Sequence, residues 1–249
     1  MVSGGFVTYG KVAGIIMLES GIPRIPGDPG HAQTFPFPVA YAVARGLPFL
    51  DLVDGKFDYV EAAISAASAL EMEGVSFIAA DCGLFSLYQE RISRKLSVPF
   101  IGSSLSLVPL LAGFLPPAFS VGILTGHAGM LRDIHLRPAG VDPSRTVIAG
   151  MEDSREFRKV VIERGNELDE DAMRADTVDA ARSLAAKAEQ DGRKLGAVVI
   201  ECTNLITFRK EIQDATRTPT YDLVSLIEMY ASGYGRRNFT EGYFSPGRA

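Results

Sequence analysis

The sequence has 249 residues, of which 47% are hydrophobic and 22% are charged, and its formal net charge is −5. This composition is typical of a globular protein with one large or two small domains and a sizeable buried core. The scattered basic residues and the negative net charge argue against a nucleic-acid-binding protein, which normally carries a basic stripe.

Continuous apolar runs alternate along the chain with longer segments of helical periodicity. The runs predict parallel strands that are covered on both faces, at residues 12–18, 75–80, 98–101, 119–124, 146–149 and 197–200. Helices are predicted between them at residues 59–73, 84–96, 154–164, 172–190 and 207–216. This order of strand, helix and strand predicts an α/β fold with right-handed crossovers.

A loop rich in proline and glycine, residues 21–38, follows the first predicted strand. Its composition excludes a helix or a sheet strand. It therefore lies at the carboxyl edge of the sheet, where α/β proteins bind ligands. We interpret it as an ordered loop over a site, with a surface loop of rigid turns as the alternative.

Residues 96–131 contain no Asp, Glu, Lys or Arg, and by length alone would indicate a transmembrane helix. Pro109, Pro116 and Pro117 interrupt this segment. We interpret it instead as two buried strands that flank a short helix. The first apolar run is short and precedes Glu19, which argues against a secretory signal. We therefore expect a cytoplasmic protein that has no membrane partner.

The two halves of the sequence resemble each other. The segment Ala13-Gly-Ile-Ile-Met-Leu18 is similar to Val121-Gly-Ile-Leu-Thr125, and their glycines are 108 residues apart. The two cysteines, Cys82 and Cys202, are 120 residues apart. These near-equal offsets predict two similar lobes. The first is expected to comprise residues 1–116 and 218–249, and the second residues 117–217.

Each cysteine ends a predicted strand and precedes a predicted helix. The partial positive charge and free N–H groups at a helix start lower a thiol pKa and can hold a carboxylate. Two such thiols facing each other across a cleft predict that one removes a proton and the other returns one to the opposite face. This two-base reaction needs no cofactor. Two cysteines are also too few for a disulfide framework.

The segments Ala80-Asp-Cys82-Gly-Leu and Ile200-Glu-Cys202-Thr-Asn-Leu carry a family resemblance. Over essentially its whole length, the chain resembles the aspartate/glutamate/hydantoin racemase superfamily, within an uncharacterised branch. The resemblance implies two flavodoxin-like lobes, each a short parallel sheet flanked by helices, with the active site at their interface. It also implies a homo-oligomer and cofactor-independent proton transfer next to a carboxylate or carbonyl.

Two motifs depart from the superfamily pattern. Cys82-Gly83-Leu84 stands where amino-acid racemases commonly have Cys-Asn-Thr, and Glu19-Ser20-Gly21 stands where many members have Asp-Ser-Gly. The change at residues 83 and 84 removes two polar side chains. We therefore expect a less polar carboxylate or a cyclic amide as substrate, in place of aspartate or glutamate.

The candidate catalytic residues are Cys82 and Cys202. The candidate substrate-binding residues share positions just after predicted strand ends, and they are Ser20, Gly83, Leu84, Ser103, Thr125, Thr203 and Asn204. Their side chains are also common helix caps, which is the structural alternative.

Four further polar residues have open roles. Asp81 and Glu201 are interpreted as caps or loop hydrogen-bonding residues, or as acids that tune the thiols or bind a substrate amine. His31 and His127 are interpreted as surface or hydrogen-bonded residues, or as general bases or ligands. The cysteines and histidines lack the short spacing of a zinc site, so no metal and no cofactor are expected.

The expected function is a racemase or epimerase, an isomerase that moves a proton at a carbon next to a carboxylate or carbonyl. One alternative is a maleate isomerase-like or arylmalonate decarboxylase-like enzyme that uses one cysteine. The other alternative is a non-catalytic protein that binds a metabolite.

Overall fold

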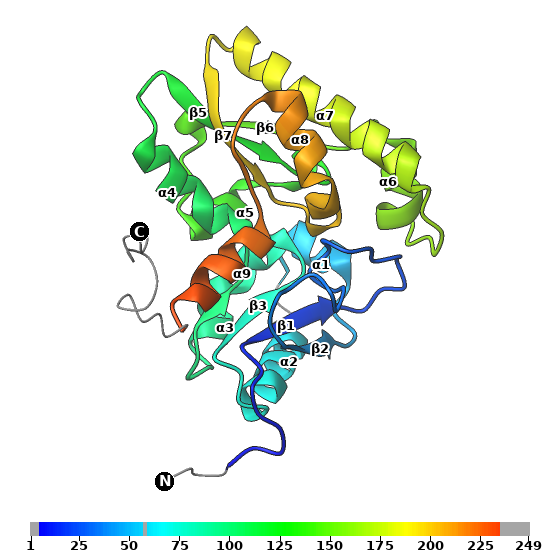
Figure 1. The fold of residues 1–249 in the computed structure, drawn as a ribbon, viewed down its shortest axis with the longest axis vertical. Coiled ribbons are helices and arrows are strands. Elements are labelled where there is room, and N and C mark those ends of the chain that lie inside the picture. Colours follow the sequence, from blue (N-terminus) through cyan, green and yellow to red (C-terminus); the bar gives the residue numbers. More distant parts are fainter. Residues whose placement is uncertain (1–4, 57–58, 235–249) are drawn as a thin grey trace, which may run out of the picture.

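The computed structural model describes residues 5–56 and 59–234. Two parallel sheets form the centres of two lobes, each flanked by helices (Figure 1). The first sheet has the order β2-β1-β3-β4, with β1 at Ala13–Leu18, β2 at Val39–Ala44, β3 at Phe77–Ala80 and β4 at Phe100–Ile101. The second has the order β6-β5-β7-β8, with β5 at Phe119–Leu124, β6 at Thr146–Ala149, β7 at Lys194–Ile200 and β8 at Thr220–Tyr221. The predicted two-lobed α/β fold is confirmed.

The α-helices are α1 at Phe49–Asp54, α2 at Val60–Met72, α3 at Gln89–Ser93, α4 at Leu107–Phe114, α5 at Asp133–Leu136, α6 at Arg155–Phe157, α7 at Glu170–Gln190, α8 at Arg209–Thr216 and α9 at Leu223–Ser232. A 3₁₀ helix at Gly83–Tyr88 leads into α3, and another at Thr203–Phe208 leads into α8. A π-helix at Arg158–Ile162 continues α6.

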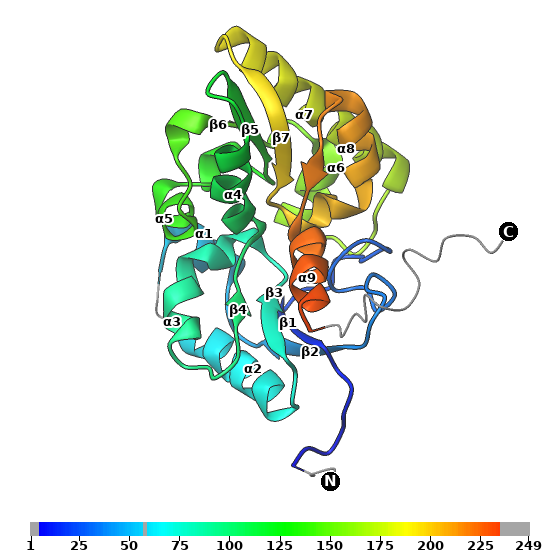
Figure 2. The ribbon, with the colours of Figure 1, turned by 60° about the vertical axis from the view of Figure 1, so that its left-hand side comes forward.

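The two lobes are tied together by an exchange of helices. After β4 the chain crosses to the second lobe, where α4 lies beside β5 and β7 (Figures 1 and 2). After β8 it crosses back, and Tyr230 of α9 packs edge-on against Phe77 of β3, with ring centroids 5.1 Å apart. The helix that follows β4 and the helix that follows β8 therefore each pack on the sheet of the other lobe.

This exchange corrects the expected lobe boundaries. Residues 107–114 are predicted to belong to the first lobe, yet α4 packs on the second sheet. Residues 218–249 are also predicted to belong to the first lobe, yet β8 is the edge strand of the second sheet. Proline and glycine positions mark turns but do not show which sheet a helix covers. Residues 235–249 lie outside the described residues.

The predicted strands are all present, because continuous apolar runs suit parallel strands that are buried on both faces. Two strands were missed. β2 is only partly buried and follows the Pro/Gly loop, and β8 has two residues. Segment 96–131 contains β4, α4 and β5, as interpreted from its prolines. None of the helices in the described residues is long and apolar enough to cross a bilayer.

The paired glycines of the two halves have the same role. Gly14 in β1 lies under Leu70 of α2, where an added Cβ would be 3.0 Å from the leucine Cβ. Gly122 in β5 lies under Leu184 of α7, where an added Cβ would be 2.9 Å from a leucine methyl. Each glycine thus lets a covering helix approach the central strand.

We expect Gly14→Ala and Gly122→Ala each to lower the free energy of unfolding by about 1–3 kcal/mol, because the added methyl overpacks a buried helix–sheet contact. Urea denaturation would measure the change. The matched control is Gly113→Ala in α4, where an added Cβ meets no atom within 4 Å. If Gly113→Ala costs as much stability as the other two variants, the packing argument is wrong.

Candidate active site

Cys82 and Cys202 occupy matching places in the two lobes. Cys82 follows β3 and caps the 3₁₀ helix Gly83–Tyr88, and Cys202 follows β7 and caps the 3₁₀ helix Thr203–Phe208. Neither sulfur accepts a capping hydrogen bond, but the nearby backbone N–H of Leu84 favours the thiolate of Cys82 and that of Asn204 favours the thiolate of Cys202. The Asn204 side-chain amide donates a hydrogen bond to Cys202 Sγ, at 3.7 Å. Both thiols are therefore held at the carboxyl edges of their sheets.

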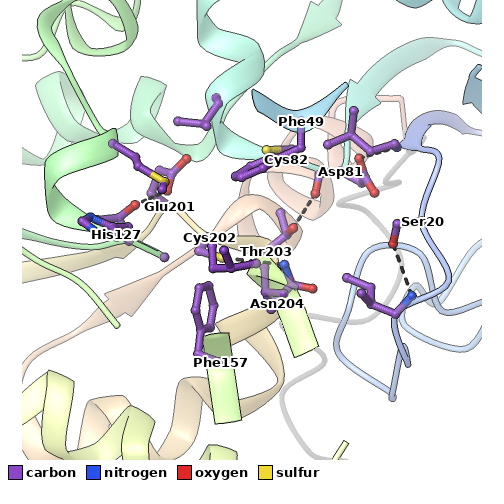
Figure 3. Close-up of a pocket in the computed structure, with 18 of the residues that line it drawn as sticks. Ser20, Phe49, Asp81, Cys82, His127, Phe157, Glu201, Cys202, Thr203 and Asn204 are labelled. Carbon is purple, nitrogen blue, oxygen red and sulfur yellow. Dashed lines mark hydrogen bonds between the residues drawn. The ribbon is translucent and has the colours of Figure 1, made fainter. Parts of the chain in front are cut away.

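One cavity between the lobes is lined by both cysteines (Figure 3). Its volume is about 780 Å³, including the mouth that opens to solvent. Its apolar wall comes from both lobes and comprises Leu18, Ile22, Phe49, Leu84, Met130, Phe157, Val161 and Ile162. The thiols thus lie in a mostly apolar chamber that has a few polar groups.

The residues on either side of each cysteine meet across the lobe interface. Thr203, after Cys202, donates its hydroxyl hydrogen bond to the main-chain oxygen of Asp81, before Cys82. Glu201, before Cys202, packs against Gly83, after Cys82. A Cβ at residue 83 would lie 2.2 Å from Glu201 Oε1 and 2.5 Å from its main-chain oxygen. Glycine is required at residue 83 because the Glu201 carboxyl fills the space of a side chain.

Asp81 is an acid held by several partners. Arg24 Nη2 donates to its Oδ2 at 2.7 Å, and the backbone N–H of Leu18 donates to its Oδ1 at 3.0 Å. Arg24 also pairs with Asp28 at 2.8 Å. Burial raises the pKa of Asp81 to about 6, although the charge of Arg24 opposes the shift. The guanidinium of Arg24 is therefore shared between two carboxylates.

Glu201 has fewer partners. Its side chain accepts one hydrogen bond, from Thr125 Oγ1 to Oε2 at 2.6 Å, and the residue is 3% exposed. Burial raises the pKa of Glu201 to about 7, and the Thr125 hydrogen bond offsets only part of the shift. This carboxyl therefore changes its protonation near neutral pH.

The pKa values of both thiols are raised, whereas the sequence led us to predict that the helix starts would lower them. Burial, followed by the charge of Glu201, raises the pKa of Cys202 to about 12 and that of Cys82 well above its ordinary value. The backbone N–H groups do act in the predicted direction, but burial outweighs them. A thiolate formed here is a strong base.

The cavity brings together most of the predicted substrate-binding residues, namely Ser20, Leu84, Thr125, Thr203 and Asn204. Gly83 and Ser103 do not line it. Gly83 is covered by Glu201, and Ser103 Oγ accepts a hydrogen bond from the Leu105 N–H at 3.1 Å, as a helix cap. The cap alternative therefore describes Ser103.

Of the histidines with open roles, His127 lines the cavity and His31 does not. Nδ1 of each accepts a hydrogen bond from a backbone N–H two residues later. No group of three or more His, Cys, Asp or Glu able to hold a metal ion occurs in residues 5–56 and 59–234. Arg24, Phe49 and Phe157 also line the cavity, and sequence reasoning missed them. Only Arg24 had a signal, as a charged residue in the loop predicted to cover a site.

No family model matches the chain. Dimethylsulfoniopropionate lyase 3 of Emiliania huxleyi (strain CCMP1516) is 30% identical over 219 residues, which are 85% of this chain and 57% of that protein. Dimethylsulfoniopropionate lyase 7 of the same organism is 29% identical and is covered over 64% of its length. The dimethylsulfoniopropionate lyase of Durusdinium sp. clade D is 28% identical over 229 residues, 89% of this chain and 74% of that protein. The match thus spans little more than half of the first of these relatives.

Solved structures with the same fold include an aspartate racemase homologue from Pyrococcus horikoshii OT3, with a TM-score of 0.54, 17% identity, and coverage of 89% of this chain and 99% of that chain. Unliganded arylmalonate decarboxylase has a TM-score of 0.56, 14% identity, and coverage of 90% and 92%. Allantoin racemase from Klebsiella pneumoniae has a TM-score of 0.55, 15% identity, and coverage of 90% and 87%. The chain therefore has the two-lobed fold of the aspartate/glutamate racemase superfamily, and the resemblance inferred from sequence is confirmed at the level of the fold.

The relatives contradict the expected activity. They are named lyases, whereas the sequence motifs led us to expect a racemase or epimerase and hence an isomerase. Proton transfer by the cysteine pair is a prediction from sequence, and neither cysteine motif predicts what would follow such a transfer. The fold is shared by racemases and a decarboxylase, so it does not separate these reaction classes either.

We expect the free energy of unfolding to fall as pH rises from about 4.5 to about 7. The pKa of Glu201 is about 7 in the folded protein against an ordinary 4.5, so the folded state binds the additional proton in this interval. Glu201→Gln keeps the shape of the side chain but cannot ionise. It should reduce the fall in the free energy of unfolding over this pH interval by on the order of 2–3 kcal/mol. Urea denaturation at several pH values would measure it. An unchanged pH slope in the variant would contradict the account.

Proposed function

We propose that the chain is a lyase that eliminates a substituent from the β-carbon of a small carboxylate, with the sulfonium acid dimethylsulfoniopropionate as its substrate. The observation that carries the proposal is that both thiols line one cavity in a chain that matches dimethylsulfoniopropionate lyases over 85% of its length. The fold is compatible with this class of reaction, because it is shared with a protein named arylmalonate decarboxylase.

The elimination uses a base and a neutral leaving group. A thiolate removes the proton from the carbon next to the carboxylate, and the electron pair of that C–H bond forms the double bond to the β-carbon. The C–S bond breaks with its electrons moving to sulfur. The products are acrylate, dimethyl sulfide and one proton for each substrate. The leaving sulfide is neutral and needs no protonation.

Cys202 is the better candidate for the base. Its sulfur accepts a hydrogen bond from the side-chain amide of Asn204, and this donor and the nearby backbone N–H of Asn204 both favour a thiolate. At Cys82 the backbone N–H of Leu84 favours the thiolate, and three charges oppose it, against the two of Glu201 and Asp28 at Cys202. We assign proton removal to Cys202, and Cys82 remains a neutral thiol beside the substrate.

The charge of the cavity suits a substrate with a cationic group. The lining includes Asp81 and Glu201. Of the two arginines that line the cavity, Arg24 is bound to two aspartates, and Arg164 donates a hydrogen bond to the main-chain oxygen of Glu19. Phe49 and Phe157 also line the cavity from opposite lobes (Figure 3). Aromatic faces attract onium cations by the cation–π interaction. The hydroxyl of Ser20 and the amide of Asn204 are donors that suit the carboxylate end of the substrate.

We expect the purified protein to release dimethyl sulfide from dimethylsulfoniopropionate, and Cys202→Ala to lower kcat/KM about 10²–10⁴-fold, which is the usual contribution of a general base. Headspace gas chromatography would measure the sulfide, and proton NMR the acrylate. Cys82→Ala is expected to lower turnover less than Cys202→Ala, because Cys82 removes no proton.

The control is Ser106→Ala, an exposed residue outside the cavity that should leave turnover unchanged. Full activity in Cys202→Ala would overturn the assignment of the base. A wild-type protein that folds but releases no sulfide would overturn the proposed substrate.

A further inference from the structure

The two acids that precede the cysteines have opposite surroundings. Both oxygens of Asp81 are bonded, one to Arg24 and the other to the Leu18 N–H. In Glu201 only Oε2 accepts a hydrogen bond, from Thr125, and within the described part of the chain no donor is bonded to Oε1. Oε1 instead lies against Gly83. Asp81 is thus tied to a cation, whereas Glu201 has a free oxygen beside the site.

The position of Glu201 depends on the asymmetry between the lobes. At the matching contact, Thr203 carries a side chain that bonds to the main-chain oxygen of Asp81. Gly83 has no side chain, and the Glu201 carboxyl fills that space from the opposite lobe. The carboxyl lines the same cavity as Cys82 and Cys202. The polar side chain that is missing after Cys82 is therefore replaced by an acid from the other lobe.

The elimination requires a route for protons. The resting thiol must lose its proton before it can act as a base, and each turnover leaves one proton in the site. A carboxyl that accepts and then releases this proton must line the cavity and must have an oxygen free of strong partners. Among the described residues that line the cavity, Glu201 meets these conditions and Asp81, bound to Arg24, does not.

We propose that Glu201 is the proton acceptor for the thiol of Cys202, an inference that rests on the lyase activity proposed above. The resting site holds the Glu201 carboxylate and the Cys202 thiol. The thiol proton moves to Glu201, the resulting thiolate removes the substrate proton, and Glu201 then releases its proton to solvent. One negative charge is thereby shared between the carboxyl and the thiols, and every proton is accounted for.

Charge repulsion favours this order of events. The charge of Glu201 is one cause of the raised pKa values of both thiols. When Glu201 takes the proton it becomes neutral, and this repulsion disappears as the thiolate forms. Other charged or titratable groups that face the cavity are Asp81 with Arg24, His127, Arg164 and the second thiol, Cys82. Asp28 faces Arg24 from the loop. A test must separate Glu201 from these groups.

The test measures alkylation of Cys202 by iodoacetamide without substrate, from pH 5 to pH 10, with the modified peptide quantified by mass spectrometry. In the wild type, alkylation of Cys202 should rise in two steps, the first near pH 7, where Glu201 loses its proton. Glu201→Gln, which keeps the Thr125 contact, should lack the first step. It should also lower kcat for sulfide release about 10²-fold, in the range expected for a proton-transfer group. Glu201→Asp should restore part of the first step.

The matched control is Asp81→Asn, which removes the acid that precedes the other cysteine and should keep the step near pH 7. A step that persists in Glu201→Gln, or that disappears in Asp81→Asn alone, would overturn the proposal. Circular dichroism confirms that each variant is folded. Because alkylation needs no substrate, loss of the step in a protein that releases no sulfide would support the proton acceptor and count against the proposed activity alone.

Discussion

The site depends on the meeting of two strand ends across the lobe interface. An acid and then a cysteine directly follow the last residue of β3 and of β7, and the residue after each cysteine contacts the acid of the other lobe. This reciprocal contact brings two thiols from distant parts of the chain to one cavity. The exchange of α4 and α9 between the sheets holds the lobes together, so the cavity is a feature of the whole fold.

Burial gives the site its chemistry and also its main cost. A mostly apolar chamber raises the pKa of both thiols, which makes a thiolate a strong base but rare at neutral pH. Two features would make the thiolate easier to form. A neighbouring acid with a pKa near 7 can accept the thiol proton. A cationic substrate would attract the negative charge of the thiolate. Asp81 and Glu201 both line this cavity, which is the feature that favours the proposed cationic substrate.

The sequence predicts the features that depend on local pattern. Strands 119–124 and 146–149 match β5 and β6 because their apolar runs are continuous, and both cysteines are placed in the site because each ends such a run. From the sequence alone, Gly83 is interpreted as the loss of a polar side chain that would contact the substrate. The acid that fills this space, Glu201, comes from the other lobe, so its position could not be predicted. Two further features also depend on residues that are distant in sequence and could not be predicted. Arg24 binds two aspartates, and α4 and α9 each pack on the sheet of the other lobe. The predicted reaction class was wrong because the leaving group belongs to the substrate and leaves no pattern in the chain.

The most direct test of the mechanism is competition between ordinary dimethylsulfoniopropionate and the same compound with deuterium next to the carboxylate, with acrylate measured by mass spectrometry. In the proposed mechanism, cleavage of that C–H bond by a thiolate is the central step. Unlabelled substrate should therefore be consumed faster, and acrylate should retain one of its two deuterium atoms at that carbon. Equal consumption of the two substrates, or formation of a 3-hydroxy acid in place of acrylate, would contradict the mechanism.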